Sequence, residues 1–212
     1  MAAEDWAKHF ISIVGNIGVG KTTFPELIGQ RFQWQVLYEK VIDNPYLADY
    51  YTNMDKWSFH LQIYFFSHRF QEQMEIAHST VSCVQDRSIY EDPEIFAHVL
   101  HQQSHLDDRD YQTYLELFSH LIPFLPKPNL FIYLRASTWT LLSRIRKRGR
   151  DFEMGITGEF LHQLNLAYEH WMRKLTSSEN VLIIDTDKLN IERDLDQLED
   201  IYKQIEERLQ RQ

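Results

Sequence analysis

The sequence lacks the features that mark secreted, membrane-spanning and disulfide-stapled proteins. Its single cysteine, Cys83, cannot form an intramolecular disulfide. No apolar run approaches the roughly 18 to 20 residues that span a bilayer, and the first residues show no basic region followed by a long apolar one. From these absences we expect a cytoplasmic protein that does not contact a membrane.

An excess of basic residues is also missing. The 22 lysines and arginines are outnumbered by 31 acidic residues, which gives a formal net charge of −9. Because nucleic acid and anionic lipid bind to basic surfaces, neither is an expected partner, and any phosphate site must be local. The 212 residues contain no repeat, linker or low-complexity segment, and 43% of them are apolar, enough for one core. We therefore predict a single domain over residues 1–212.

A glycine-rich segment behind an apolar run is the strongest motif. Residues 15–22 read GNIGVGKT, directly after 10–14 (FISIV), and fit the phosphate-loop pattern G-x-x-x-x-G-K-[ST]. Glycines let backbone N–H groups turn toward phosphate oxygens, Lys21 supplies a cation for the β and γ phosphates, and Thr22 offers a hydroxyl to Mg²⁺. This segment is therefore expected to bind the phosphates of a nucleoside triphosphate through Gly15, Asn16, Ile17, Gly18, Val19, Gly20, Lys21, Thr22 and Thr23.

Five short runs of β-branched or aromatic residues alternate with longer, helix-like segments. They are residues 10–14, 35–39, 81–86, 130–134 and 181–185. Their spacing leaves room for crossover helices, which predicts an α/β fold with a parallel five-stranded sheet flanked by helices. Since ligands collect at the carboxyl ends of parallel strands, the phosphate loop, Glu39 and the segment 86–88 (DRS) should share one edge.

The longer segments favour helices over residues 57–78, 92–105, 109–122, 138–148 and 191–212. In the first of these, an apolar stripe at helical spacing is expected to face the core; it consists of Phe59, Ile63, Phe66, Phe70 and Met74. Gln62 and Arg69 lie two turns apart on a neighbouring face, a placement that is by itself typical of solvated surface.

A cluster of arginines follows the fourth predicted strand. Arg144 and Arg148 belong to the basic helix over 138–148, and Arg150 comes after Gly149. A charged run is usually a solvated face. Beside a phosphate loop, however, arginines on a movable segment could close over transferring phosphates, so we expect an arginine-bearing lid here.

Taken together, these motifs resemble the family of deoxyadenosine, deoxyguanosine and deoxycytidine kinases, the deoxynucleoside kinases. Beyond the phosphate loop the resemblance rests on Glu39 with 43–47 (DNPYL), on 57–59 (WSF) leading to Gln62 and Arg69, on 86–90 (DRSIY) and on 144–153. It covers nearly the whole chain. It implies the P-loop kinase fold, ATP and Mg²⁺, a deoxynucleoside substrate and a homodimer.

The resemblance also implies roles around the transferred phosphoryl group. Glu39 would be the general base for the sugar 5′-hydroxyl, and Arg87 would pair with Glu39 and stabilise the phosphoryl oxygens. Lys21 would contact the phosphates, and Asp86 would hold the Mg²⁺ shell with Thr22.

The implied substrate contacts are Glu39, Tyr51, Gln62, Phe65, Arg69, Arg87, Asp92, Phe96 and Glu153. Gln62 would bond the edge of the base and Phe96 would stack on its face. Tyr51 and Glu153 would read the sugar 3′-hydroxyl.

Two of these residues, Arg69 and Asp92, correspond to a charged pair in relatives that take purine deoxynucleosides or deoxycytidine. A site built to hydrogen-bond its substrate discriminates strongly, and Phe65 would narrow the pocket. We therefore expect deoxyadenosine to be favoured, with deoxyguanosine and deoxycytidine behind it.

The chain departs from the family pattern at two places. The catalytic glutamate is often followed by proline, and here Lys40 follows Glu39, which changes the electrostatics beside that carboxylate. Pro25 falls in the first turn of the helix behind the phosphate loop, where a missing N–H is tolerated, so we expect the loop to form.

Other classes remain open. A nucleoside monophosphate kinase of the thymidylate kinase type shares the phosphate loop, an Asp-Arg pair and an arginine lid, but an acidic Glu39 would repel the phosphate of its acceptor. A nucleotide-dependent switch or a non-catalytic binding module is a second alternative, although both guanine-nucleotide motifs of GTPase switches are missing. His98, His101 and His105 recur at helical spacing and could ligate zinc, but no cysteine or acid completes such a site.

Overall fold

A five-stranded parallel sheet forms the centre of the protein. The computed structural model describes residues 8–39, 44–187, 189 and 194–210. The strands are β1 (Phe10–Gly15), β2 (Gln35–Leu37), β3 (Cys83–Asp86), β4 (Leu130–Arg135) and β5 (Val181–Asp185), in the spatial order β2-β3-β1-β4-β5. All four strand pairs are parallel, which confirms the predicted sheet.

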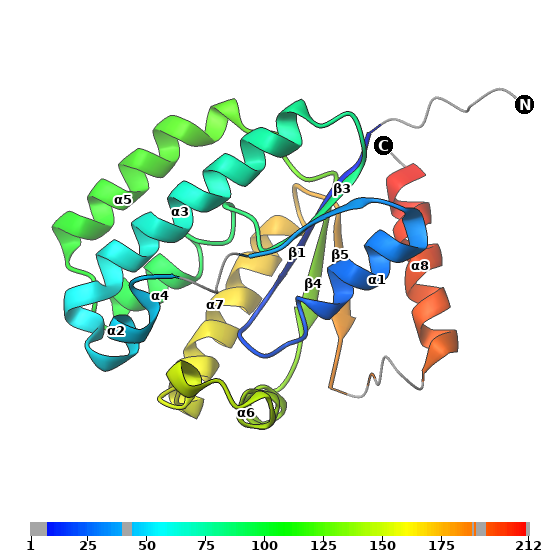
Figure 1. The fold of residues 1–212 in the computed structure, drawn as a ribbon. Coiled ribbons are helices and arrows are strands. Elements are labelled where there is room, and N and C mark those ends of the chain that lie inside the picture. Colours follow the sequence, from blue (N-terminus) through cyan, green and yellow to red (C-terminus); the bar gives the residue numbers. More distant parts are fainter. Residues whose placement is uncertain (1–7, 40–43, 188, 190–193, 211–212) are drawn as a thin grey trace, which may run out of the picture.

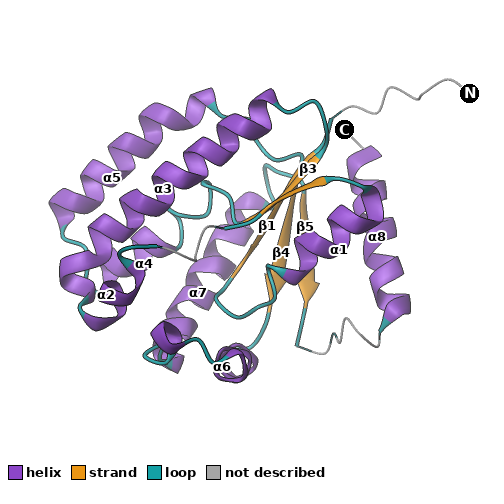
Figure 2. Ribbon diagram, in the orientation of Figure 1, coloured by secondary structure: helices purple, strands orange, loops and turns teal. Residues whose placement is uncertain are grey.

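The helices cover both faces of this sheet (Figures 1 and 2). They are α1 (Thr23–Phe32), α2 (Leu47–Thr52), α3 (Met54–His78), α4 (Phe96–Gln102), α5 (Asp108–Leu121), α6 (Thr138–Arg148), α7 (Gly158–Leu175) and α8 (Leu195–Gln210). Figure 1 shows α1 and α8 on one face, with α3, α5 and α7 on the other. The strands β1, β3 and β4 are buried almost throughout because they are covered on both sides.

The order of the strands places the phosphate loop at a reversal of the chain's path. From β1 the chain moves outward to β2, and from β3 it crosses β1 to reach β4. The carboxyl ends of β1 and β3 therefore flank a topological switch point, where α/β sheets bind ligands. Ile13 is in register with Asp86, so the segments after these two strands leave the sheet side by side.

Several predicted boundaries are wrong, each for a local reason. The second strand ends at Leu37, because it is an edge strand that pairs with β3 over only three residues, and Glu39 lies beyond it. The helix expected over 92–105 is reduced to Phe96–Gln102: residues 91–95 form turns, and Ser104 has a left-handed φ of 61°. His105 therefore lies outside that helix, and the three histidines do not share one helical face.

Two helices, α2 and α7, were not predicted from the sequence. The side chain of Asn53 accepts a hydrogen bond from the Lys56 N–H at 3.1 Å, and this cap separates α2 from the longer α3. The other helix, α7, begins where the Thr157 side chain accepts from the Phe160 N–H at 3.1 Å, and its apolar residues at helical spacing pack into the core.

The buried face of α3 differs from the predicted one. Of the expected stripe only Phe66 is fully buried, whereas Phe59, Ile63, Phe70 and Met74 are half-buried. Gln62 and Arg69, whose spacing on its own was typical of solvated surface, are buried instead. The α3 helix thus directs the polar side chains of Gln62 and Arg69 toward the interior, where they line a cavity beside the sheet.

Other expectations about elements are confirmed. Pro25 lies in the first turn of α1 and is buried there, and the arginine-rich helix spans Thr138–Arg148 and ends at Gly149 with a left-handed φ of 67°. Cys83 is a fully buried residue of β3.

In the part of the chain that the structure describes, no helix is both long enough and apolar enough to cross a bilayer. Lys40 lies outside the described residues.

Candidate active site

A cavity of about 790 Å³ opens at the carboxyl edge of the sheet. It is lined by residues from the phosphate loop, from the end of β3, from α2 and α3, and from the segment after α6. The expected site residues that line it are Ile17, Gly18, Gly20, Lys21, Thr22, Thr23, Glu39, Tyr51, Gln62, Phe65, Arg69, Asp86, Arg87, Asp92, Phe96, Arg144, Arg148, Arg150 and Glu153. One continuous space therefore joins the loop to the side chains expected to bind a nucleoside.

The phosphate loop is held by contacts with neighbouring elements. The Asn16 side chain donates to the Leu161 carbonyl oxygen and to Asn165 Oδ1 on α7, both at 2.8 Å. Gly18 has a φ of 82°, and a Cβ there would lie 2.8 Å from the Ile145 side chain of α6, so only glycine fits. The Lys21 Nζ donates back to the Asn16 carbonyl oxygen at 2.8 Å. The loop is thus shaped before any phosphate arrives.

Burial, with a further contribution from Arg87, lowers the pKa of Lys21 to about 8. The side chain is 8% exposed, and its ammonium group donates to the Asn16 carbonyl oxygen. A phosphate oxygen would bring negative charge to this buried cation and favour its charged form.

Next to Lys21, a hydroxyl and a carboxylate meet at the edge of the cavity. The Thr22 hydroxyl donates to Asp86 Oδ2 at 3.2 Å, while the buried Asp86 Oδ1 makes no hydrogen bond. Burial raises the pKa of Asp86 and Glu39 adds to the rise, against the opposing effects of Lys21, Arg87 and the Thr22 hydrogen bond. Two oxygen donors with one unsatisfied carboxylate oxygen suit a hard cation such as Mg²⁺.

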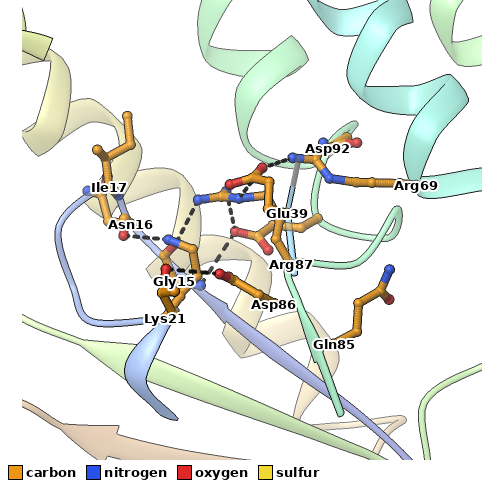
Figure 3. A network of polar contacts seen from close by, with 12 residues as sticks. Gly15, Asn16, Ile17, Lys21, Glu39, Arg69, Gln85, Asp86, Arg87 and Asp92 are labelled. Atoms are coloured by element: carbon orange, nitrogen blue, oxygen red, sulfur yellow. Dashed lines mark hydrogen bonds and ion pairs between the residues drawn. The ribbon is translucent and has the colours of Figure 1, made fainter. Parts of the chain in front are cut away.

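The Glu39 carboxylate lies between two guanidinium groups (Figure 3). Arg87 Nε contacts Glu39 Oε1 at 3.1 Å, and Arg69 also contacts this oxygen. Burial alone would raise the pKa of Glu39, but Arg87 and Arg69 outweigh it and hold the pKa below its ordinary value. At neutral pH the carboxylate is therefore ionised and faces the cavity.

Arg87 is held by contacts with several elements of the site. Its backbone has a left-handed φ of 66°, which is uncommon outside glycine. Besides Glu39, its guanidinium contacts Glu91 at 2.7 Å and donates to the Gly15 carbonyl oxygen at 3.3 Å. The group also lies 4.4 Å from the centre of the Phe96 ring. Arg87 therefore cannot turn without breaking several contacts at once.

The side of the cavity expected to hold the base has a second ion pair. Arg69 contacts Asp92 in a buried bridge, and its guanidinium lies 4.7 Å from the centre of the Phe65 ring. Three polar atoms in this region are buried without a hydrogen-bond partner, namely Gln62 Oε1, Arg69 Nε and Asp92 Oδ2. Since buried polar atoms are normally satisfied, this set points to a polar ligand.

The three expected lid arginines are already engaged. Arg144 donates to the Val19 carbonyl oxygen at 3.1 Å and to the Thr186 carbonyl oxygen at 2.6 Å, so it braces the phosphate loop from α6. The Arg148 guanidinium forms a paired contact with the Glu153 carboxylate at 2.7 and 2.8 Å, and Arg150 reaches the same carboxylate at 3.5 Å. In this arrangement the two outer arginines face the predicted sugar-binding glutamate rather than the phosphates.

Sequence reasoning missed two buried residues of the site, Glu91 and Tyr168. Both contact Arg87, and both contact Gly15 at the start of the phosphate loop. The signal for Glu91 was its place four residues after Arg87 in the stretch 90–92 (YED). The signal for Tyr168 was the apolar spacing of α7, which shows a helix but does not distinguish Tyr168 from ordinary core.

The chain matches the family described as deoxynucleoside kinase over residues 11–210. It belongs to that family. A deoxyadenosine/deoxycytidine kinase of Bacillus subtilis (strain 168) is 36% identical over 194 residues, which cover 90% of this chain and 89% of the relative. A deoxyadenosine kinase of Dictyostelium discoideum is 42% identical over 166 residues, which cover 78% of this chain and 67% of the relative.

A solved structure of a deoxynucleoside kinase agrees with the fold. The deoxyadenosine kinase from M. mycoides with bound dATP superimposes with a TM-score of 0.81 at 29% identity, over 92% of this chain and 99% of that one. Membership of the deoxynucleoside kinase family makes the chain an enzyme of the P-loop kinase fold and rules against the GTPase switch. The family resemblance drawn from the sequence is confirmed.

Proposed function

We propose that this deoxynucleoside kinase transfers the γ-phosphoryl group of ATP to the 5′-hydroxyl of a deoxyribonucleoside, with deoxyadenosine favoured and deoxyguanosine or deoxycytidine as further substrates. One observation supports this proposal above the others. The ionised Glu39 carboxylate lies between Arg87, which contacts the phosphate loop, and Arg69, which contacts the base-side Asp92.

The chemistry follows from these positions. Glu39 accepts a hydrogen bond from the 5′-hydroxyl and takes its proton as the new oxygen–phosphorus bond forms. The bond between the γ phosphorus and the bridging oxygen breaks, and ADP leaves with the electron pair. Lys21 and Arg87 supply positive charge that would stabilise the phosphoryl oxygens. Since little covalent chemistry falls to the protein, alignment of the reactants supplies most of the rate.

Thr22 and Asp86 would hold Mg²⁺ beside the β and γ phosphates. The ion would neutralise phosphate charge when bound. The unpartnered Asp86 Oδ1 supports this assignment because it offers an oxygen that no protein group uses.

The hydrogen-bonding pattern on the base side supports a base that carries an amino group. Gln62 Oε1 and Asp92 Oδ2 are acceptors, and Arg69 Nε is a donor. The exocyclic amine of adenine donates two hydrogen atoms, and its ring nitrogens accept. Cytosine also carries an exocyclic amine beside an accepting ring nitrogen, so deoxycytidine is a further candidate substrate. Phe65 and Phe96 line the cavity as flat surfaces for the base, and Tyr51 with Glu153 would read the 3′-hydroxyl.

A neutral hydroxyl suits the acceptor side better than a phosphate does. Both arginines near the acceptor position already contact carboxylates, Arg69 with Asp92 and Arg87 with Glu91. An incoming monophosphate would meet the Glu39 carboxylate, and carboxylates already compensate the charge of both guanidinium groups. A monophosphate acceptor, as in the thymidylate kinase type, is therefore disfavoured.

A phosphorylation assay tests the proposal. The chain is incubated with ATP and Mg²⁺ and with each of the four natural deoxynucleosides, and deoxyadenosine is compared with its 5′-monophosphate. We expect the largest kcat/KM for deoxyadenosine. Faster turnover of the monophosphate would replace the proposal with a monophosphate kinase, and ATP binding without transfer to any acceptor would favour a binding module.

A homodimer and a cytoplasmic location stay predictions from the sequence and the family resemblance. Light scattering coupled to gel filtration measures the first directly. A mass near twice the 25.5 kDa of the chain is the expected result.

A further inference from the structure

Arg87 is held from two sides, and only one side faces the proposed reaction. Its Nε contacts Glu39, the expected general base. Its other nitrogens face inward: Nη1 contacts Glu91 at 2.7 Å, and Nη2 donates to the Gly15 carbonyl oxygen at 3.3 Å. The orientation of Arg87 therefore depends on a fully buried carboxylate and a backbone carbonyl as well as on Glu39.

Tyr168, from the centre of α7, joins these inward groups together. Its hydroxyl donates to the Gly15 carbonyl oxygen at 2.8 Å, contacts Glu91, and accepts from Arg87 Nη1 at 3.2 Å. The Gly15 N–H points to Glu91 Oε1 at 3.4 Å. Four residues from three separate parts of the chain therefore share one compact network.

The network is closed to solvent. Glu91 and Tyr168 are both 0% exposed, and Arg87 is 3% exposed. Water cannot replace a missing partner there, and the low polarity strengthens each remaining interaction. A buried carboxylate is also expensive: apolar side chains of similar volume are often at least as stable in such a place. Packing of α7 against the sheet does not by itself require a buried Glu91 in contact with the Tyr168 hydroxyl.

We propose that Glu91 and Tyr168 are positioning residues for phosphoryl transfer, which fix the Arg87 guanidinium relative to Gly15, the first residue of the phosphate loop. The inference rests on the function proposed above. The Arg87 N–H donates to the Ile13 carbonyl oxygen at 3.0 Å, which joins the backbones of the two segments, but the long Arg87 side chain needs a further tie to hold its guanidinium against the loop. Glu91 and Tyr168 provide that tie, because each contacts both the arginine and the loop.

The test uses Tyr168→Phe and Glu91→Gln, with Tyr133→Phe as a matched control. Tyr133 stacks on Tyr168 with ring centres 5.5 Å apart, but its hydroxyl donates to Glu169, outside the network. We expect kcat with deoxyadenosine and ATP to fall about 10- to 100-fold in Tyr168→Phe and Glu91→Gln, because a small misplacement of a catalytic group is costly. The KM values for both substrates should stay within about twofold, and Tyr133→Phe should match the wild type.

A second measurement does not depend on turnover. In protein labelled with ¹⁵N, the Nε–H signal of Arg87, assigned with Arg87→Lys, reports how well the guanidinium is held. Its exchange with solvent should be faster by about tenfold or more in Tyr168→Phe and unchanged in Tyr133→Phe. Should Glu91→Gln fail to fold, Tyr168→Phe alone still decides, since it removes a single hydroxyl.

The outcomes separate this inference from the proposed function. If the wild-type chain phosphorylates no deoxynucleoside, the proposed function fails, whatever the Arg87 signal shows. If Tyr168→Phe keeps both the wild-type kcat and the wild-type Arg87 exchange, the positioning role is overturned. A rise in KM for ATP with unchanged kcat would also overturn it, because the pair would then shape the phosphate loop rather than place Arg87.

Discussion

Arg69 contacts Glu39, which lies 30 residues earlier in the chain. The same guanidinium contacts Asp92 through its other terminal nitrogen. A side chain expected to read the base is thus bonded directly to the side chain expected to accept the 5′-hydroxyl proton. We therefore expect recognition of the base and ionisation of the Glu39 carboxylate to be coupled through Arg69.

This coupling predicts that removal of Arg69 reaches beyond base binding. In Arg69→Met, Asp92 and Glu39 are both deprived of a buried counter-ion, so both carboxylates become harder to keep ionised. We expect kcat/KM for deoxyadenosine to fall by about 100-fold or more, the scale expected when a buried, hydrogen-bonded charge pair is broken, with a lower kcat as well as a higher KM. Arg173→Met, on an exposed position of α7, is the control and should leave both parameters near wild type. A defect confined to KM would contradict the coupling.

Glu39→Gln tests the acceptor carboxylate itself. The amide keeps the shape but cannot take the hydroxyl proton, and kcat should fall by at least about 10²-fold. Steady-state kinetics with deoxyadenosine measure the change, and a thermal melt shows whether the variant is folded. A near-normal rate would remove Glu39 from the mechanism.

Gly18 is predicted to be irreplaceable in the phosphate loop. In Gly18→Ala, the added Cβ would meet the Ile145 side chain at 2.8 Å and the Leu141 carbonyl oxygen at 3.0 Å, in a left-handed backbone that costs alanine about 1 to 2 kcal/mol by itself. We expect KM for ATP to rise about tenfold or more and the melting temperature to drop by several degrees. Gly155→Ala is the matched control, since a Cβ there meets nothing within 4 Å. Equal effects in the two variants would argue against a specific role for Gly18.

The rate should depend on pH through Glu91. Burial raises the pKa of Glu91 to about 7, against the opposing effects of Arg87, Lys21 and Arg69, while Asp92 adds to the rise. Above this pH the carboxylate is charged and pairs with Arg87; below it the group takes up a proton and the pairing weakens. We therefore expect kcat to fall as the pH decreases through about 7. Glu39 does not contribute to this fall in kcat near pH 7, because its pKa is lowered.

The control for this dependence is Glu91→Gln, which carries no titrating group at that position. Its kcat between about pH 6 and 8, the range that brackets the Glu91 titration, should be low and nearly flat. An acid limb with the same midpoint in the variant would assign the titration to another group.

Much of the site was already visible in the sequence because its residues stand at the ends of elements. The phosphate loop follows a β-branched run, and the strand rhythm predicts a parallel sheet whose carboxyl edge collects Lys21, Glu39, Asp86 and Arg87. Hydrophobic periodicity and the residues that begin or end a helix or strand are local properties of the sequence, so they can be recognised without knowledge of the fold. The helix over 138–148 was placed correctly for the same reason, since Gly149 ends it.

What only the tertiary structure decided concerns side chains whose partners come from distant segments. The periodicity of α3 could not show that Gln62 and Arg69 face inward, because the partner of Arg69 is Asp92, 23 residues later. Arg148 and Arg150 looked free to reach phosphates until Glu153 proved to hold them. The sequence signals for Glu91 and Tyr168 did not show that the two residues meet: they are 77 residues apart, and their contact exists only because α7 packs behind the phosphate loop. The sequence thus determined the chemistry of the loop, and the packing of α3 and α7 determined which charges surround it.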